Sequence, residues 1–334
     1  MTVRIMNLVA PLPHKGTDMH TTDTAGSSLD RSGAVSPLKA RQGDVESANE
    51  RRSSRTSTTA TRTTTTSLPS AECVPSADSS NYSFELLLRA YLDCRKHKRN
   101  TGSALAFEQN LEHNLWQLHR ELIDGSYAPG KSICFVITRP KAREVWAAAF
   151  RDRIVHHLLH NQIGPRFYAR FIADSCACIK GRGTLYAAER LESKVRSITQ
   201  NWSRPAYYLK LDLANFFVAI DKGILRDLIA ARVTEPFWLK LAETIIFHDP
   251  RLDFEYRGDE AMLDLVPAHK RLTNQPAHLG LPIGNLSSQF FANVYLDVLD
   301  QFVKHGLRAR HYIRYVDDFV LLHESAQWLN EALA

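Results

Sequence analysis

The 334-residue sequence lacks the features of secreted, disulfide-stabilised or membrane proteins. Its five cysteines are an odd number without a Cys-x-x-Cys pair, which argues against a disulfide framework and a four-ligand zinc site. No apolar run approaches the ~18–20 residues that span a bilayer. The apolar stretch at the start is too short for a signal peptide. We therefore expect a cytoplasmic protein with no membrane role.

The sequence also lacks a strong charge of either sign. Its 42 Lys+Arg against 36 Asp+Glu give a formal net charge of +6, which is compatible with polyanion binding but does not establish it. Hydrophobic residues make up 44% and charged residues 23%, as in ordinary globular proteins. At roughly 100–200 residues per domain, the length predicts one large or two modest domains.

Residues 1–80 show almost no apolar periodicity. They include a Ser/Thr-rich tract at 53–67, which cannot repay the entropy of ordering by burial. We expect residues 1–80 to be a disordered Ser/Thr-rich segment. Acidic residues scattered between 18 and 50 argue against a transit peptide, and a translation start placed too far upstream is an equally good explanation of the segment.

Helical and strand patterns begin at residue 81 and form an α+β sequence without internal repeats. The apolar spacing predicts helices at 84–92, 104–123, 144–162, 184–199, 222–232, 237–247 and 285–304. Apolar and β-branched runs predict strands at 132–138, 206–213, 311–316 and 319–323. A polar connector, residues 248–278, contains the pattern of a short hairpin.

Two adjacent carboxylates, Asp317 and Asp318, are the only residues between the last two expected strands. This placement puts two negative charges at the edge of an apolar core. Aspartate is also a common turn residue. The pair alone therefore does not distinguish a catalytic site from an ordinary turn.

A third carboxylate, Asp212, interrupts the apolar strand expected at 206–213. A carboxylate there is costly unless it is paired or binds a metal, and a strand-end Asp that caps the next turn is the structural alternative. Neighbouring antiparallel strands would bring Asp212 and Asp317 together. Carboxylates that leave positions open for phosphates suit Mg²⁺, and two such ions ~3.5–4 Å apart support phosphoryl transfer.

A Gly/Pro turn precedes the helix expected at 285–304. Its sequence is Gly280-Leu-Pro-Ile-Gly-Asn-Leu-Ser-Ser-Gln289. Glycine lets the backbone approach a flat ligand closely, and a helix start offers free amides. An ordinary loop with a Ser or Asn cap fits the same residues.

Taken together, these motifs resemble the palm motifs of reverse transcriptases. They are Asp212 with Phe217 five positions later, the Leu281-Pro-Ile-Gly284 turn, and Tyr315-Val-Asp-Asp318. Upstream, segments 140–143, 150–153 and 174–184 look like the fingers motifs of bacterial members. The resemblance covers residues 84–324. It implies a right-hand polymerase fold with fingers at 81–206 and, at 207–334, an incomplete palm that has an antiparallel sheet and contains the connector.

The resemblance also implies catalytic roles. Asp212, Asp317 and Asp318 match the catalytic carboxylates, which hold two Mg²⁺ ions, or Mn²⁺ in their place. The main-chain carbonyl of Leu213 matches a further ligand. As a primer 3′-hydroxyl attacks the α-phosphate, such ions lower the cost of the developing charge.

Other positions match the deoxynucleotide site of the family. Lys141 and Arg143 match basic fingers residues that grip the triphosphate, although without the motif context a solvated basic turn explains them better. Phe217 matches the bulky residue under the sugar, where a ring excludes a 2′-hydroxyl. Ile283 and Gly284 match the turn beside the nascent base pair.

The turn most resembles that of reverse transcriptases from diversity-generating retroelements. Most family members have Gln where this chain has Ile283, and Ser-Pro further along. The resemblance implies error-prone copying of a template RNA into cDNA. The partners it implies are template RNA, primer or cDNA, deoxynucleoside triphosphates and a small basic accessory protein.

The end of the chain departs from the family. Only eleven residues follow His323, whereas related polymerases continue with the rest of the palm and a helical thumb. We therefore expect a C-terminally truncated protein with the thumb missing. Two alternatives stay open, an inactive palm and fingers fragment that retains RNA or protein binding, and a reverse transcriptase of the retron or abortive-infection kind.

Overall fold

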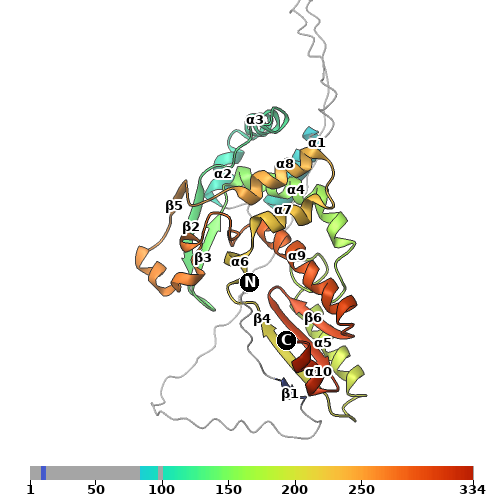
Figure 1. The fold of residues 1–334 in the computed structure, drawn as a ribbon. Helices are drawn as coiled ribbons and strands as arrows, with labels where there is room; N and C mark the ends of the chain where they lie inside the picture. The colour runs from blue at the N-terminus through green and yellow to red at the C-terminus, as the bar shows by residue number, and fades with distance from the viewer. Residues whose placement is uncertain (1–8, 13–82, 97–100, 334) are drawn as a thin grey trace, which may run out of the picture. The chain divides into compact units, whose positions relative to one another are not determined.

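A four-stranded sheet is formed by three strands from the C-terminal half of the chain and one strand from near the N-terminus. Its strands follow the order β1 (Val9–Pro11), β4 (Tyr207–Asp212), β7 (Asp318–His323) and β6 (His311–Tyr315), and all neighbouring pairs are antiparallel. The computed structural model describes residues 9–12, 83–96 and 101–333 (Figure 1), all within one compact unit. The α+β class and an antiparallel sheet are thus confirmed.

The two faces of this sheet differ in chemistry because side chains alternate along each strand. Leu209 and Leu211 of β4 are buried, while Lys210 between them is exposed. In β7, Phe319 and Leu321 are buried and Asp318 is exposed. One face therefore packs on the core, and the other presents polar side chains near the β4–β7 end.

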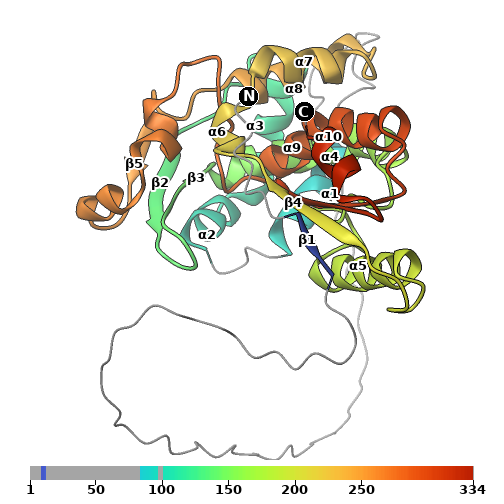
Figure 2. The same cartoon turned by 60° about the horizontal axis from the view of Figure 1, so that its bottom comes forward.

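A second, three-stranded sheet is built from distant parts of the chain. β2 (Ser132–Ile137) pairs antiparallel with β3 (Arg143–Ala147) and parallel with β5 (Phe254–Tyr256). β5 belongs to the connector, so the connector is attached to this sheet. Figure 2 shows the connector, in orange, beside β2.

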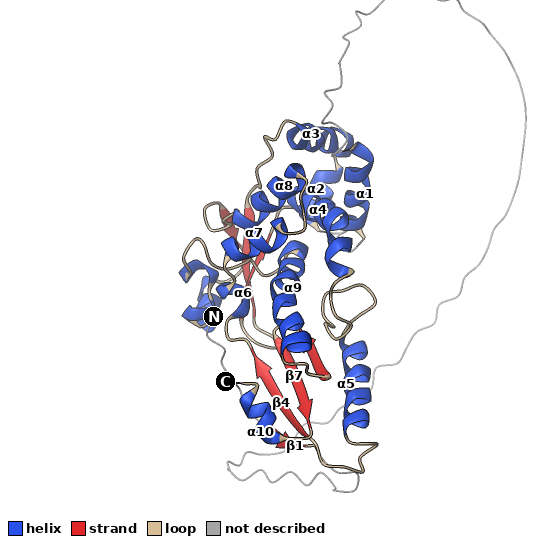
Figure 3. Ribbon diagram, turned by 45° about the vertical axis from the view of Figure 1, so that its right-hand side comes forward, coloured by secondary structure: helices blue, strands red, loops and turns tan. Residues whose placement is uncertain are grey.

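Helices fill the space around the two sheets (Figure 3). The N-terminal helices are α1 (Phe84–Arg95), α2 (Gly102–Glu108), α3 (Leu111–Ile123), α4 (Phe150–Tyr168) and α5 (Thr184–Ile198). The later ones are α6 (Phe216–Ala219), α7 (Lys222–Ala230), α8 (Pro236–Phe247), α9 (Leu286–Gln301), a π-helical turn (Phe302–Gly306) and α10 (Ala326–Glu331). Three 3₁₀ helices in the connector are η2 (Glu260–Leu265), η3 (Ala268–Lys270) and η4 (Leu272–Asn274).

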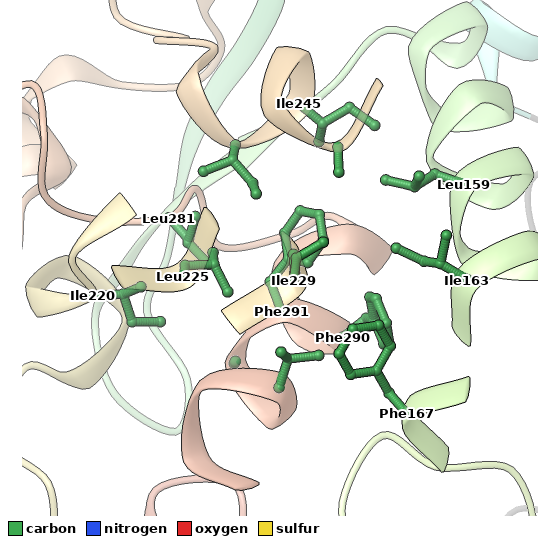
Figure 4. Close-up of a cluster of buried hydrophobic side chains, with 14 of the residues drawn as sticks. Leu159, Ile163, Phe167, Ile220, Leu225, Ile229, Ile245, Leu281, Phe290 and Phe291 are labelled. Carbon is green, nitrogen blue, oxygen red and sulfur yellow. The ribbon is translucent and has the colours of Figure 1, made fainter. Parts of the chain in front are cut away.

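The main core lies where α4, α7, α8 and α9 meet (Figure 4). Phe290 of α9 packs edge to face on Phe167 of α4, with ring centroids 5.5 Å apart. Ile229 of α7 and Ile245 of α8 are buried in the same cluster. Because α9 begins directly after the 280–284 turn, burial of this helix fixes where the turn lies.

No helix in the described ranges is long and apolar enough to cross a membrane.

A buried ion pair connects α9 to the four-stranded sheet. The side chains of Arg314 in β6 and Asp300 in α9 are both 0% exposed, and two N–H···O bonds of 2.8 and 2.7 Å join them. The remaining guanidinium donors bond Asn293 Oδ1 (3.1 Å), Ser175 Oγ (2.8 Å) and the carbonyl of Val316 (2.8 Å). All five guanidinium donors are therefore used.

Several predicted elements need correction. Residues 143–147 are a strand, not the start of a helix, because Val145 and Trp146 pair with β2 and are buried. The helix predicted at 104–123 is two helices, since the backbone at Asn110 leaves the helical region (φ −127°, ψ 49°). The connector holds no hairpin of its own, because β5 pairs with β2 instead.

The expectation of a disordered segment over 1–80 is wrong at Val9–Pro11. These residues form β1, whose backbone pairs with the outer edge of β4. The pairing supplies hydrogen-bond partners that a composition argument does not consider. Apart from Leu12, the other residues of that segment lie outside the described ranges.

We predict that Arg314→Met lowers the free energy of unfolding by about 3–5 kcal/mol, because it leaves the buried carboxylate of Asp300 without its counter-charge. Urea unfolding followed by circular dichroism measures the loss. The double variant Arg314→Met, Asp300→Leu removes both charges and should recover part of it. A double variant less stable than Arg314→Met would show that the ion pair is not the source of the loss.

Candidate active site

A cleft of about 580 Å³ opens at the β4–β7 end of the four-stranded sheet. Four parts of the chain form its walls, namely the end of this sheet with the following α6 segment, the 280–284 turn, the β2–β3 hairpin and the connector. The charged side chains that line it are Lys141, Arg143, Glu144, Lys210, Asp212, Lys270, Asp317 and Asp318. The apolar lining includes Leu213, Phe217, Val266 and Ile283.

The three predicted carboxylates lie at one end of the sheet. Asp212, the last residue of β4, is the direct antiparallel partner of Asp318, the first residue of β7. Side chains of directly opposed residues share one face, with Cβ atoms about 4.5–5.5 Å apart. Asp317 lies in the turn just before β7, and its carbonyl accepts a 3.3 Å hydrogen bond from the Leu213 amide. Pairing of β4 with β7 therefore brings together residues 105 positions apart.

This turn has an unusual backbone that the buried arginine supports. Val316 adopts a left-handed conformation, with φ 57°, which is costly for a β-branched residue. The carbonyl of Val316 accepts the 2.8 Å bond from Arg314 Nη1. The turn that carries Asp317 is thus attached to the core by a fully buried side chain.

The carboxylates repel one another. Burial raises the pKa of Asp317, the negative charges of Asp212 and Asp318 raise it further, and the Arg143 guanidinium opposes the shift. The Lys210 ammonium is 3.9 Å from Asp318, and both side chains are more than half exposed, so this pair contributes little. The end of the sheet therefore holds negative charge that favours a cation.

The side chains do not form a closed metal cage. Within the described ranges, no group of three or more His, Cys, Asp or Glu side chains is arranged to hold a metal ion. Mg²⁺ does not require such a group, because it is usually held by one or two carboxylates together with waters and substrate phosphates. The oxygen-only donors Asp212 and Asp317 fit that requirement.

The β2–β3 hairpin places two cations on the opposite wall. Arg143 opens β3 opposite Ile137, and Lys141 lies in the loop between the strands. Both side chains are exposed, and neither makes an ion pair with any residue that the structure describes. They are available to an anion that enters the cleft.

The 280–284 turn is fixed against β3. Gly284 has φ +120°, and a Cβ there would lie 2.8 Å from Val145 Cγ1 and 3.2 Å from the Trp146 carbonyl, so only glycine fits. The Trp146 amide donates a 2.7 Å bond to the Ile283 carbonyl. This contact holds the half-buried Ile283 side chain at the cleft, whereas Gly284 shapes the turn without lining the cleft.

Asn285 strengthens the same junction. Its Nδ2 donates to the Trp146 carbonyl at 3.0 Å, and its Oδ1 accepts from the Ala148 amide at 3.0 Å. One side chain therefore supplies both a donor and an acceptor to the edge of β3 that faces away from β2. The sequence pattern is that of an Asn helix cap, but the Asn285 side chain makes no cap bond to α9.

Phe217 lies on the floor of the cleft. It follows Asn215, whose left-handed backbone (φ 56°) turns the chain from β4 into α6. The Phe217 carbonyl accepts a 2.8 Å bond from the Leu281 amide, and its half-buried ring packs edge to face against Phe216, with centroids 5.4 Å apart. Leu213 lines the cleft beside it.

Sequence reasoning missed Lys210 and Lys270 as cleft residues. Lys210 could have been found, since it lies two positions before Asp212 on the same face of a predicted strand. No sequence pattern assigns Lys270 to the cleft, because its position depends on how the connector packs on the three-stranded sheet.

Comparison with protein families and with curated proteins gave no match. The solved structures that are similar include two titled "Partial Cas6-RT-Cas1--Cas2 complex" and "Cas6-RT-Cas1--Cas2 complex". Each is 17% identical over 76% of this chain, with a TM-score of 0.40. This chain spans 40% and 25% of the matched chains. A TM-score of this size does not establish a shared fold, so the case for a function depends on the cleft itself.

Proposed function

We propose that the cleft is the active site of an RNA-directed DNA polymerase. One observation carries the proposal. Eight of the residues predicted from motifs spread between positions 141 and 318 line a single cleft, namely Lys141, Arg143, Asp212, Leu213, Phe217, Ile283, Asp317 and Asp318. Convergence of carboxylates, cations and an aromatic ring suits a metal-bound nucleoside triphosphate better than a structural role for each motif.

The proposed division of the cleft follows its charges. Asp212 and Asp317 would hold Mg²⁺, with Asp318 and the Leu213 carbonyl as further oxygen donors. When bound, the metal stabilises the charge that develops on the α-phosphate during attack by a primer 3′-hydroxyl. Arg143 and Lys141, on the opposite wall, would bind the triphosphate oxygens and keep the reacting groups in line.

The apolar residues would select and align the nucleotide. Phe217 occupies the floor beside Asp212, where a ring under the sugar leaves no partner for a 2′-hydroxyl and so favours deoxynucleotides. The Ile283 side chain would contact the nascent base pair only through van der Waals packing, because it has no hydrogen-bonding group. This feature favours the finer proposal of error-prone copying of a template RNA into cDNA, as in diversity-generating retroelements, with a small basic accessory protein as partner.

We predict that Asp317→Ala abolishes Mg²⁺-dependent addition of a deoxynucleotide, because it removes a metal ligand from the half-buried turn at the end of the sheet. The assay is single-nucleotide addition to a short primed RNA at low salt with protein in excess, so that processivity is not required. Asp124→Ala, at an exposed carboxylate at the end of α3, is the matched control and should retain wild-type activity. Addition by Asp317→Ala at the wild-type rate would refute the polymerase assignment, and RNA binding by an inactive wild-type chain would support a non-catalytic role.

A second prediction tests the cation site without activity. The raised pKa of Asp317 means that its ionised form destabilises the fold above that pKa, and the cost disappears as the pH falls below the value in the unfolded chain. Without Mg²⁺ at neutral pH, Asp317→Asn should therefore melt above the wild type, and the difference should shrink on acidification. Added Mg²⁺ should stabilise the wild type more than the variant.

Thermal melting across pH, with and without Mg²⁺, measures both effects. A Tm difference that does not change with pH would show that the carboxylate charge is not its cause. Equal Mg²⁺ stabilisation of both proteins would place the cation elsewhere.

A third prediction concerns fidelity. Ile283→Gln adds an amide at the cleft, and a net hydrogen bond contributes about 0.5–1.5 kcal/mol. We expect misincorporation opposite template adenine to fall by up to about tenfold on that hydrogen-bond scale, with smaller changes opposite other bases. Sequencing cDNA made by both proteins on one template provides the measurement. An unchanged adenine error rate would place the source of infidelity in other residues of the cleft.

A further inference from the structure

The connector forms one wall of the cleft through Val266 and Lys270. The sequence pattern predicts a short hairpin here, whereas the segment contains the single strand β5 and three 3₁₀ helices. Figures 1 and 2 both show it beside β2. Lys270, the last residue of η3, therefore belongs to an ordered wall.

A buried carboxylate anchors the connector just after Lys270. Glu144 of β3 is 4% exposed, and its Oε2 accepts a 2.6 Å bond from the Leu272 amide. From the other side, Arg251 Nη1 donates to the carbonyls of Leu272 (3.1 Å) and Gln275 (2.5 Å). These bonds attach η4 to the three-stranded sheet, so the backbone next to Lys270 is fixed relative to Arg143.

Some charged side chains that line the cleft already bond or pair with other protein groups, whereas others have no such partner among the described residues. Glu144 is occupied by the connector, and Lys210 lies near Asp318. Lys270 is exposed and, like Lys141 and Arg143, makes no ion pair with the described residues. Its neighbour Arg271, in contrast, bonds the Val266 carbonyl and pairs with Asp264. Of this basic stretch, Lys270 lines the cleft with its ammonium available.

We propose that Lys270 is a third phosphate-binding residue of the cleft and binds the triphosphate of the incoming nucleotide from the connector side. The inference depends on the proposed function, because the ligand is the substrate of that reaction. A triphosphate presents several oxyanions along its length, and ammonium groups from two walls can bind different ones. Lys141 and Arg143 approach from the hairpin, whereas Lys270 approaches from the connector. Phosphates of the nucleic-acid backbone are the other source of the same chemistry, and the experiment separates the two.

The test is nucleotide binding by the full chain on a short primed RNA. The probe is a fluorescent α,β-imido deoxynucleoside triphosphate, which cannot be incorporated, titrated in the presence of Mg²⁺. Lys270→Gln should raise the Kd of this probe about tenfold, which corresponds to about 1.4 kcal/mol, and should leave the Kd of the primed RNA unchanged. Lys270→Arg keeps the charge and should restore most of the affinity.

Lys240→Gln is the matched control, because Lys240 is an exposed lysine of α8 that does not line the cleft. It should bind the probe as the wild type does. Unchanged probe affinity in Lys270→Gln would overturn the inference, as would weaker RNA binding with unchanged nucleotide binding. A wild type that binds the probe but adds no nucleotide would contradict the polymerase assignment alone, and loss of binding in Lys270→Gln would still show the phosphate contact.

Discussion

The buried pair of Arg314 and Asp300 is the interaction on which the geometry of the cleft depends. A guanidinium with no access to water has to satisfy five donors within the protein, and here they reach α9, the segment around Ser175 and the carbonyl before Asp317. An apolar pair of similar volume could give equal or greater stability. It could not donate a hydrogen bond to the Val316 carbonyl. What the charged pair adds is therefore a fixed position for the turn that carries Asp317.

The carboxylates at the end of the sheet likewise do not contribute stability. Asp212 and Asp318 face each other across a strand pair, where like charges are destabilising, and Asp317 is raised in pKa beside them. Stability alone would favour asparagine at one of these positions. Three carboxylates gathered at the rim of a cleft, with only the exposed Lys210 among the described residues in ion-pair distance of one of them, are instead expected where a cation and its ligand complete the structure on binding.

The sequence was informative where a local pattern determines structure. Asp212 and the pair of Asp317 and Asp318 could be placed approximately, because alternation of buried and exposed side chains fixes a strand's faces and a very short link between two apolar strands indicates a tight turn. The turn is shifted by one residue from the prediction and consists of Val316 and Asp317, because Asp318 already belongs to β7. The register that makes Asp212 the partner of Asp318 could not be read this way. The local pattern predicts a helix from 144 onward, and it misses the strand at 144–147 because the contact that forms this strand, the pairing with β2, lies outside any local window.

The connector shows most clearly which features a local sequence pattern cannot predict. Its β5 strand pairs with β2, more than a hundred residues earlier in the chain, and its position is fixed by one buried carboxylate, Glu144. A polar segment without periodicity gives no sign of such attachments, so Lys270 could not have been assigned to the cleft from sequence. Through its bond to the Leu272 amide, Glu144 fixes the position of the connector relative to the β2–β3 hairpin. Lys270 lies two residues before the bonded Leu272 amide, and Arg143 directly precedes Glu144, so cations from two distant segments of the chain line one cleft.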